Sequence, residues 1–460
     1  MKKLVRGGTV VTATEMFDAD VLVEDEQIAW VGRSEDAEAD EVIDASGCFV
    51  LPGLIDNHTH LSMPFGGTVT ADDFDTGTAA AAAGGTTCIV DFALQTDGSL
   101  LKGLETWKAN AEGRAHVDYA FHLAVSEASP EAIREIPRAV EEGVSTFKLF
   151  MAYKGALMVD DLEMLNVFEA MAETGALPMV HAENGDAIVF LQERAAAAGE
   201  LAPRFHATTR PPEVEAEATS RAIRLATWAG SPLFVVHVSC EPAVAEIQRA
   251  RDAGLPIYGE TCIQYLALTV EDLAREGFEG AKFVCSPPLR EAYNHDVLWS
   301  ALRQQALQIV STDHCPFNYE TQKSLGRDDF RLIPNGLPTI ESRLAVMYEY
   351  GVRGGKITMP ELVRMVSTAP AQLFGLAPSK GAIAAGADAD LVVFDPSVET
   401  TISAATHKMN VDYNPFEGHA VHGEPRVVLA RGDVVFRDGD VVSSPGRGRY
   451  VARDCVSLGS

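Results

Sequence analysis

The sequence has few basic residues and no closely spaced cysteines, and each deficit excludes a class of protein. Lysine and arginine number 37 against 66 aspartate and glutamate residues, so the formal net charge of the 460-residue chain is −29. Nucleic-acid binding needs a basic surface for phosphate contacts, so we expect no nucleic-acid partner. The seven cysteines form no Cys-x-x-Cys unit, and an odd, scattered set is typical of free thiols in a reducing, cytoplasmic setting.

Long apolar segments are also missing. No run of about 18 consecutive apolar residues occurs, so we expect no membrane partner, and the opening Met-Lys-Lys lacks the apolar core of a signal peptide. What the chain does have is a composition that is 47% hydrophobic and 22% charged, which suits a large buried core. Its length leaves room for roughly two to four domains, or for one large barrel with an accessory domain.

Both ends of the chain have the pattern of an antiparallel sheet. Apolar and polar residues alternate, with acidic or Gly-Asp turns, in segments 21–32, 41–50, 389–396 and 425–442. We expect residues 1–52 and 372–440 to join into one small β-sandwich domain, followed by a C-terminal tail at residues 441–460.

Between these ends, eight short apolar runs recur, most of them followed by a helical pattern. The runs span residues 51–61, 86–94, 117–125, 145–152, 177–183, 233–239, 256–262 and 308–314. Clear helix patterns at 130–143 and 242–254 end in glycine, as helices commonly do. The alternation predicts an α/β fold with a TIM-like (β/α)8 barrel over residues 53–371. No glycine-rich phosphate loop is present, which disfavours a doubly wound sheet.

Side chains that can bind metal recur in the second half of several runs. In such a barrel the functional groups gather at the C-terminal ends of the strands. His58 and His60 are two positions apart, so both imidazoles lie on one face of their strand and can share an ion. Later runs contribute His181, His237 and Asp313. A lone histidine in a strand is more often a core residue, but this set on four strands predicts a metal site.

Lys148 lies inside the fourth run, between Phe147 and Leu149. Alternation directs these two neighbours toward the outer helices and Lys148 into the barrel, where an ammonium beside metal ions would be costly. The residues alone leave two interpretations open. Either the lysine reaches the rim or pairs with a carboxylate, or it has reacted with carbon dioxide to form a carbamate, an anion able to bridge two metal ions.

Six motifs occur in order along nearly the whole chain. They are GLIDNHTH, FKLFMAYKG, HAENGD, VVHVSC, STDHCPF and HKMNVDYNPFEG. Together they resemble the dihydropyrimidinase/hydantoinase branch of the amidohydrolase superfamily. The resemblance implies a metal-dependent barrel with a β-sandwich, N6-carboxylysine at Lys148, zinc as the usual metal, and a homotetramer, with a dimer as the alternative.

The resemblance also implies a role for each site residue. The ligands it implies are His58, His60, Lys148 and Asp313 for one divalent ion, and Lys148, His181 and His237 for the other. Asp313 would also carry a proton to the leaving ring nitrogen. Tyr153 would stabilise the oxyanion, and Ser286 and Asn335 would bind the substrate ring, mainly through backbone groups.

Apolar residues follow the first and fourth strands, where exposed loops are usually polar. We expect Met63, Phe65, Leu157 and Met158 to form a pocket for the substituent on the substrate ring, with packing of the loops among themselves as the alternative. Glu183 follows His181 with same-face spacing, which favours a supporting role for its carboxylate.

These features predict an enzyme that opens the cyclic amide bond of dihydropyrimidines or 5-substituted hydantoins and releases N-carbamoyl amino acids. Its substrate would be a small-molecule cyclic ureide. Allantoinase or dihydroorotase activity is the alternative, although the dihydroorotase motif HxHxR has an arginine where this chain has Ser62. A metal-free scaffold, of the kind related to dihydropyrimidinases in animal neurons, is disfavoured because every expected ligand is present.

Overall fold

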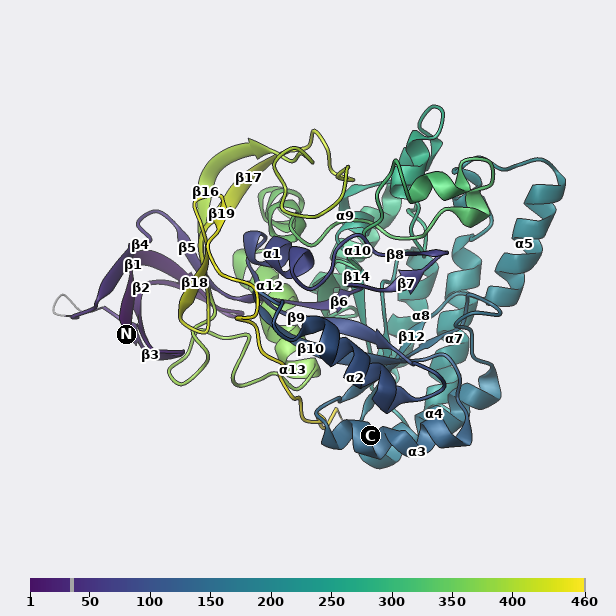
Figure 1. Cartoon of the computed structure of the whole chain (residues 1–460), viewed down its shortest axis with the longest axis horizontal. Coiled ribbons are helices and arrows are strands. Elements are labelled where there is room, and N and C mark those ends of the chain that lie inside the picture. The colour runs from purple at the N-terminus through teal and green to yellow at the C-terminus, as the bar shows by residue number, and fades with distance from the viewer. Residues whose placement is uncertain (34–36, 459–460) are drawn as a thin grey trace.

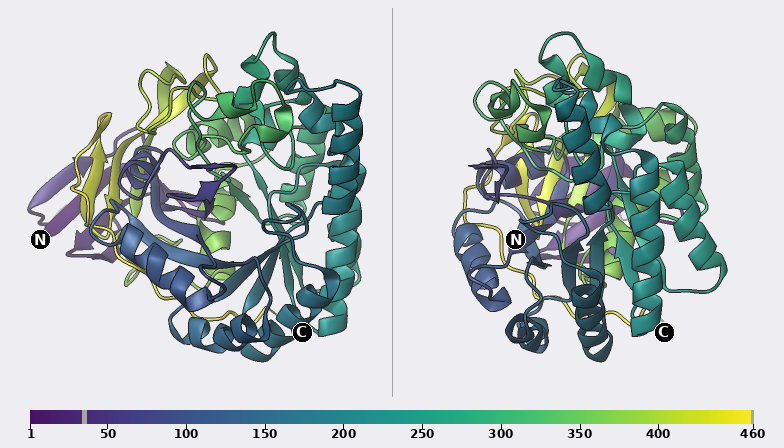
Figure 2. Two further views of the ribbon diagram at one scale, coloured as in Figure 1. Left: turned by 45° about the vertical axis from the view of Figure 1, so that its right-hand side comes forward. Right: turned by 90° about the vertical axis from the view of Figure 1, so that its right-hand side faces the viewer.

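The computed structural model describes residues 1–33 and 37–458, which form an eight-stranded parallel barrel and a separate sheet built from both ends of the chain (Figure 1). Helices surround the barrel, and the terminal sheet lies to one side of it (Figure 2). The predicted fold class is confirmed.

The barrel strands coincide with the eight apolar runs. They are β6 (Leu54–Thr59), β9 (Thr86–Leu94), β10 (Asp118–Val125), β11 (Thr146–Phe150), β12 (Leu177–His181), β13 (Leu233–Val235), β14 (Ile257–Cys262) and β15 (Ile309–Ser311). Each strand pairs in parallel with the next one in this order. Nearly all of their side chains are buried, because helices cover the outer face and the inner face fills the barrel.

The first and last strands close the barrel through backbone hydrogen bonds just beyond their C-terminal ends. The N–H of His60 donates to the carbonyl of His314 at 2.9 Å, and the N–H of His314 donates to the carbonyl of His58 at 3.2 Å. Closure therefore occurs at the level of the predicted ligands. It places the segment of Asp313 beside the segment of His58 and His60.

Helices follow the strands around the barrel. The longer ones are α1 (Thr76–Ala83), α2 (Leu100–Ala111), α3 (Pro130–Glu141), α4 (Asp161–Thr174), α5 (Gly185–Ala197), α7 (Pro212–Ala229), α8 (Glu241–Asp252) and α10 (Tyr293–Arg303). The short ones are α6 (Phe205–Thr208), α9 (Gln264–Ala267), α11 (Arg343–Val346), α12 (Met359–Val363) and α13 (Ala369–Leu373). The two helix patterns noted in the sequence are α3 and α8. None of the described helices is long and apolar enough to cross a bilayer.

The terminal sheet joins segments that are far apart in the sequence. The N-terminal strands are β1 (Lys2–Val11), β2 (Met16–Glu24), β3 (Gln27–Gly32), β4 (Glu41–Asp44) and β5 (Phe49–Pro52). The C-terminal strands are β16 (Leu391–Thr401), β17 (Ala420–Ala430), β18 (Asp433–Arg437) and β19 (Asp440–Val441). The two groups meet where β5 pairs antiparallel with β16, and their buried aliphatic side chains form one cluster. The predicted joining of the two ends is confirmed.

The chain after β19 returns to the barrel at the end opposite the predicted ligands. The N–H of Tyr119 donates to the carbonyl of Arg449 at 3.0 Å, and the N–H of Val451 donates to the carbonyl of Tyr119 at 2.8 Å. The Arg453 guanidinium is buried and donates to Thr146 Oγ1 at 2.9 Å. Because these partners lie at the starts of β10 and β11, the tail is bound to the barrel at the N-terminal ends of its strands.

Candidate metal centre and substrate pocket

The predicted metal ligands gather at one end of the barrel. They are His58 and His60 at the end of β6, Lys148 in β11, His181 at the end of β12, and His237 and Asp313 shortly after β13 and β15. All of them except His58 line one pocket, and the His58 side chain is buried directly beneath it. Parallel strands present their C-terminal ends at a single rim, so residues far apart in the sequence share this site.

His58, His60 and Asp313 form the first group of candidate ligands. The Oδ1 atom of Asp313 lies 3.1 Å from Nε2 of His58 and 3.2 Å from Nε2 of His60. The ligand atoms of the three residues all lie within 4.8 Å of one another. The Nζ atom of Lys148 lies 3.1 Å from the same Nε2 of His58, so four potential ligands converge on one point.

His181 and His237 form the second group. The Nδ1 atom of His181 lies 2.9 Å from Nε2 of His237. The ring of His237 is 5.5 Å from the ring of His58, measured between centroids, so the two groups adjoin. Lys148 lines the same pocket as both histidines of this group. The arrangement can therefore hold two ions side by side.

Burial and neighbouring charges together set the protonation states of the candidate ligands. It lowers the pKa of His60 to about 4, and it lowers the pKa of His237 well below its ordinary value. Burial alone would raise the pKa of Asp313, but the charge of His58 and hydrogen bonds with His58 and His60 hold that pKa well below its usual range. Neutral imidazoles, as at His60 and His237, and an ionised carboxylate are the forms that bind divalent metals. At His58, burial and the Lys148 charge lower the pKa, but the charges of Asp313 and Glu260 outweigh them and raise it, so this ring must lose its proton when a metal binds.

Lys148 is buried, and among the described residues its Nζ forms no direct ion pair. Its side chain is 1% exposed, and no carboxylate oxygen lies within 4.0 Å of its Nζ in the described parts of the chain. The Nζ atom also lies over the rings of Phe92 and Phe150, at 4.4 and 5.1 Å from their centroids. Burial lowers the pKa of Lys148 to about 8. Of the two interpretations left open by the sequence, a lysine at the rim or in an ion pair does not match this geometry.

Three pocket residues have a left-handed backbone conformation. The angle φ is 66° at Tyr153, 42° at His237 and 48° at Asp313. This conformation costs non-glycine residues about 1–3 kcal/mol each, and it persists only where surrounding contacts enforce it. Each of the three follows a barrel strand, so the strain is located where the chain leaves the barrel and its side chains enter the pocket.

Buried carboxylates fix the orientation of two candidate ligands. Glu260, in β14, lies with Oε1 2.5 Å from Nδ1 of His58, which directs Nε2 of that ring to Asp313. Glu183 lies with Oε2 2.8 Å from Nε2 of His181, which directs Nδ1 of that ring to His237. Such partners set the tautomer of a ligating histidine. The sequence analysis missed Glu260, although a carboxylate in the middle of a buried strand was a usable signal.

Glu183 is in turn held by an arginine. Arg210 donates from Nη1 to Oε2 of Glu183 at 2.8 Å, and both side chains are buried. Burial would raise the pKa of Glu183, but the Arg210 charge and the His181 hydrogen bond lower it to about 2. The supporting role expected for this carboxylate agrees with these contacts, while the participation of Arg210 had no signal in the sequence.

Tyr153, Ser286 and Asn335 line the same pocket as the candidate ligands. The ring centroid of Tyr153 lies 5.2 Å from that of His181. Burial raises the pKa of Tyr153 to about 12, so the phenol keeps its proton and can donate a hydrogen bond. Asn335 donates from Nδ2 to Oγ of Ser286 at 3.0 Å, which links the two loops expected to bind the ring.

Met63, Phe65 and Leu157 also line this pocket. Phe65 lies in a small hairpin formed by β7 (Pro64–Phe65) and β8 (Thr68–Val69), and its ring meets that of Tyr153 edge-on at 5.3 Å. Met158 is not among the lining residues. Its sulfur packs against Gly185 at the start of α5, so the expectation that Met158 lines the pocket is wrong.

Comparisons with known proteins bear on this site. The amidohydrolase family model matches residues 49–435. The D-hydantoinase of Geobacillus stearothermophilus is 54% identical, over 98% of this chain and 97% of that protein. The D-hydantoinase of Streptomyces coelicolor is 51% identical, over 98% of both chains. The crystal structure of dihydropyrimidinase from Brevibacillus agri has a TM-score of 0.98 and 53% identity, and the match covers 99% of each chain.

The chain belongs to the D-hydantoinase/dihydropyrimidinase branch of the amidohydrolase family. Amidohydrolases are metal-dependent, and the residues of this member fit that dependence. Imidazole nitrogen and carboxylate oxygen are ligands that Zn²⁺ accepts in catalytic sites. Here such atoms converge in two adjoining buried groups, and the supporting carboxylates orient the ring nitrogens toward them.

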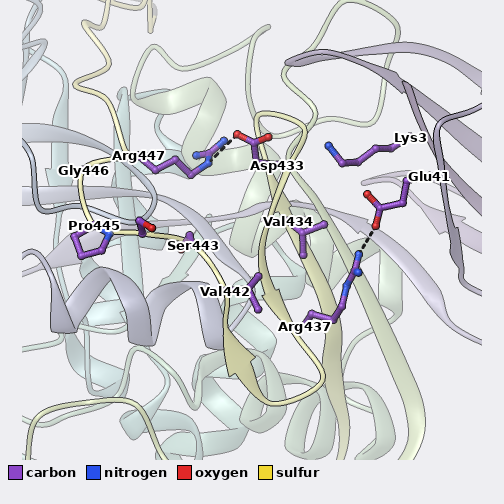
Figure 3. A pocket seen from close by; sticks show the side chains of 11 residues that line it. Lys3, Glu41, Asp433, Val434, Arg437, Val442, Ser443, Pro445, Gly446 and Arg447 are labelled. Carbon is purple, nitrogen blue, oxygen red and sulfur yellow. Dashed lines mark hydrogen bonds and ion pairs between the residues drawn. The ribbon is translucent and has the colours of Figure 1, made fainter. Parts of the chain in front are cut away.

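A second hollow, of about 650 Å³, lies between the terminal sheet and the tail and lacks this chemistry (Figure 3). Two of its three cations are paired with carboxylates, because Arg437 lies 2.6 Å from Glu41 and Arg447 lies 3.4 Å from Asp433, and the third, Lys3, donates to the carbonyl of Gly432. Its described lining residues include no histidine. The barrel pocket therefore remains the candidate active site of this amidohydrolase.

Proposed function

We propose that this amidohydrolase opens the cyclic amide bond of dihydropyrimidines or 5-substituted hydantoins and releases N-carbamoyl amino acids. The observation that carries the proposal is the barrel pocket, in which two adjoining groups of candidate metal ligands face a protonated phenol and an apolar hairpin. The relatives described above are named for these same two activities. A neutral ring with polar carbonyl and N–H groups suits the polar side chains of this pocket, and an apolar ring substituent suits its apolar side chains.

We propose that two divalent metal ions, zinc in the cell, occupy the two groups. The ligands would be His58, His60, Lys148 and Asp313 for one ion, and Lys148, His181 and His237 for the other. When bound, the ions would polarise the substrate carbonyl and lower the pKa of water. Lys148 would act as N6-carboxylysine: its amine forms a bond to the carbon of carbon dioxide and releases one proton. Among the described residues no carboxylate oxygen lies within 4.0 Å of this buried amine, which supports the modification.

Three kinds of protein group then act on the substrate. Asp313 accepts the proton of the attacking water and delivers it to the leaving ring nitrogen, because an ionised carboxylate in the pocket can do both. Tyr153 donates its phenolic proton in a hydrogen bond to the developing oxyanion. Ser286 and Asn335 orient the ring, mainly through their backbone groups.

A panel of ring substrates tests the proposal and separates it from dihydroorotase activity. A substrate with a ring carboxylate needs a cation, and the chain has Ser62 at the arginine position of the dihydroorotase motif. Two arginines near the expected ring-binding residues are already paired, since Arg290 contacts Glu215 at 2.8 Å and Arg210 contacts Glu183 at 2.8 Å.

We therefore expect hydrolysis of dihydrouracil or a neutral 5-substituted hydantoin, with kcat/KM at least about 100-fold lower for dihydroorotate. Allantoin and both hydantoin enantiomers complete the panel, and product formation is measured together with metal content. A kcat/KM for dihydroorotate that equals or exceeds the values for neutral rings would contradict the proposed substrate class.

Specificity for the ring substituent is expected to depend on the apolar residues at the mouth. We expect Phe65→Ala and Leu157→Ala to change the preference between bulky and small 5-substituents by about tenfold or more, because each removes apolar contact area from one side of the pocket. Relative kcat/KM values on a matched pair of hydantoins provide the measurement. Phe17→Ala, on the exposed face of the terminal sheet, is the control. Equal losses on both substrates would indicate general loop packing instead.

We further propose a homotetramer, with a dimer as the alternative, and a cytoplasmic location. The resemblance to the family supports the assembly, and seven free cysteines support a reducing compartment. We also propose that residues 53–371 act as the catalytic domain, residues 1–52 and 372–440 as the β domain, and residues 441–460 as the tail. Sedimentation of the purified protein distinguishes four copies from two.

A further inference from the structure

We propose that Lys323 is a positioning residue for the substrate, because it holds and polarises the backbone of the two loops that carry Ser286 and Asn335. The inference rests on the proposed function, since it concerns the binding of the same ring. Lys323 lies in a short helical turn (Lys323–Gly326) outside the set of candidate ligands.

The Lys323 ammonium is fully buried, and its hydrogen-bond partners among the described residues are three backbone carbonyls. It donates to the carbonyl oxygens of Val284 at 2.8 Å, Pro334 at 2.9 Å and Gly336 at 2.8 Å. These bonds use all three of its N–H donors. Within residues 1–33 and 37–458, no carboxylate oxygen lies within 4.0 Å of its Nζ. The charge of this lysine is therefore compensated by peptide dipoles of the two loops.

The three carbonyls surround the residues expected to bind the ring. Val284 precedes Ser286 by two positions, and Pro334 and Gly336 flank Asn335 on either side. The N–H of Gly336 also donates to the carbonyl of Val284 at 3.0 Å. One buried cation thus joins the two loops, together with this direct bond between them.

Peptide geometry connects this cation with the substrate. In a trans peptide the C=O and N–H bonds point in opposite directions. The carbonyl of Pro334 points to Lys323, so the N–H of Asn335 points away from Lys323, and Asn335 lines the pocket. That N–H has no acceptor among the described residues. A peptide polarised by an ammonium is a stronger donor, which suits a carbonyl of the ring.

A neutral side chain could not replace the lysine. For the carbonyls of Pro334 and Gly336, Lys323 is the sole hydrogen-bond partner in the described parts of the chain. A buried carbonyl without a partner is costly, so the loops would shift to satisfy it. Burial lowers the pKa of Lys323 to about 7, whereas the three carbonyl oxygens favour its charged form.

The same loop is also held from its other side, so loss of Lys323 is expected to loosen the loop rather than unfold the barrel. The N–H of Cys315 donates to the carbonyl of Leu337 at 3.1 Å. A Cβ on Gly336 would lie 2.2 Å from the carbonyl oxygen of Cys315, so the two segments are in close contact. Cys315 follows Asp313 by two positions, which places the loop against the candidate metal centre.

The test compares Lys323→Met with Lys3→Met in the metal-loaded protein. Lys3 is a matched control: it is also buried and donates to a backbone carbonyl, that of Gly432 at 2.7 Å, but it lies in the terminal sheet (Figure 3). For Lys323→Met we expect KM for a neutral ring to rise about 10- to 100-fold, with a much smaller change in kcat and unchanged metal content. Amide hydrogen exchange is expected to accelerate at residues 284–286 and 333–337. The Lys3 variant should show neither effect.

A second variant, Lys323→Gln, separates position from charge, because it keeps two N–H donors without the cation. We expect its KM to lie between the wild-type and Met values. An unchanged KM in Lys323→Met, an equal rise in the Lys3 control, or failure of both Lys323 variants to fold would overturn the proposal. If the wild-type protein opens no ring, the proposed function fails, and the exchange rates of the two loops still decide the role of Lys323.

Discussion

In protein that carries Lys148→Ala, we expect the loss of most bound metal and at least about a 100-fold decrease in turnover. Lys148 is the residue proposed to bridge both ions, and removal of a partner that only supports a ligand already costs about 10- to 100-fold. Its Nζ lies 3.1 Å from Nε2 of His58 and faces the same pocket as His181 and His237. Metal analysis of the purified protein, together with turnover on a neutral ring, measures both effects.

The Lys148 variant has a specific rescue and a specific control. Short carboxylic acids should restore part of the activity, because a free carboxylate can take the place of the lost carbamate. Lys3→Ala removes another buried lysine, in the terminal sheet, and should retain its metal. Native mass measurement of the wild-type protein should show the added mass of one carbon dioxide, and the variant should lack it. Metal content equal to that of the wild type would contradict the bridging role of Lys148.

The second large effect is expected for Asp313→Asn. The amide has nearly the same shape as the carboxylate, but it cannot accept a proton from the attacking water. We expect turnover to fall by about 10²- to 10⁴-fold while the protein remains folded. The low pKa of Asp313, held down by its contacts with His58 and His60, means that the wild-type carboxylate is ionised and available as the base.

The Asp313 variant is measured by steady-state kinetics and thermal unfolding in parallel. Asp20→Asn is the control, because Asp20 is also a buried carboxylate, accepts a hydrogen bond from the N–H of Gly7 at 2.8 Å, and lies in the terminal sheet. That variant should lose stability without a comparable loss of turnover. Near wild-type turnover in Asp313→Asn would show that the proton follows another route.

Buried hydrogen-bonded networks hold the candidate ligands in their orientations. Glu260 orients His58, and Glu183 with Arg210 orients His181. On the substrate side, Lys323 binds the backbone of the loops that carry Ser286 and Asn335, and it does not contact the candidate metal ligands. The metal side and the ring side of the pocket therefore have separate supports, so variants in one should affect metal content and variants in the other should affect KM.

Local patterns in the sequence were sufficient to place the strands and the candidate ligands. The period of two within apolar runs locates the barrel strands, and the same period places His58 and His60 on one face and Lys148 on the inner face of β11. Position near the end of a strand then selects His181, His237 and Asp313, because parallel strands share one functional rim. These inferences need only the order of residues along each strand.

Contacts between distant segments were decided by the tertiary structure alone. Glu260 meets His58 across 202 positions, and Lys323 meets Val284 across 39, because barrel closure and loop packing bring these segments together. Met158 is a case in which the local pattern was misleading. Its apolar side chain predicted a place in the pocket, but its sulfur packs against Gly185 instead. Local periodicity determines which face a side chain occupies, whereas its partner depends on strand order and loop path, which are set by the packing of the whole chain.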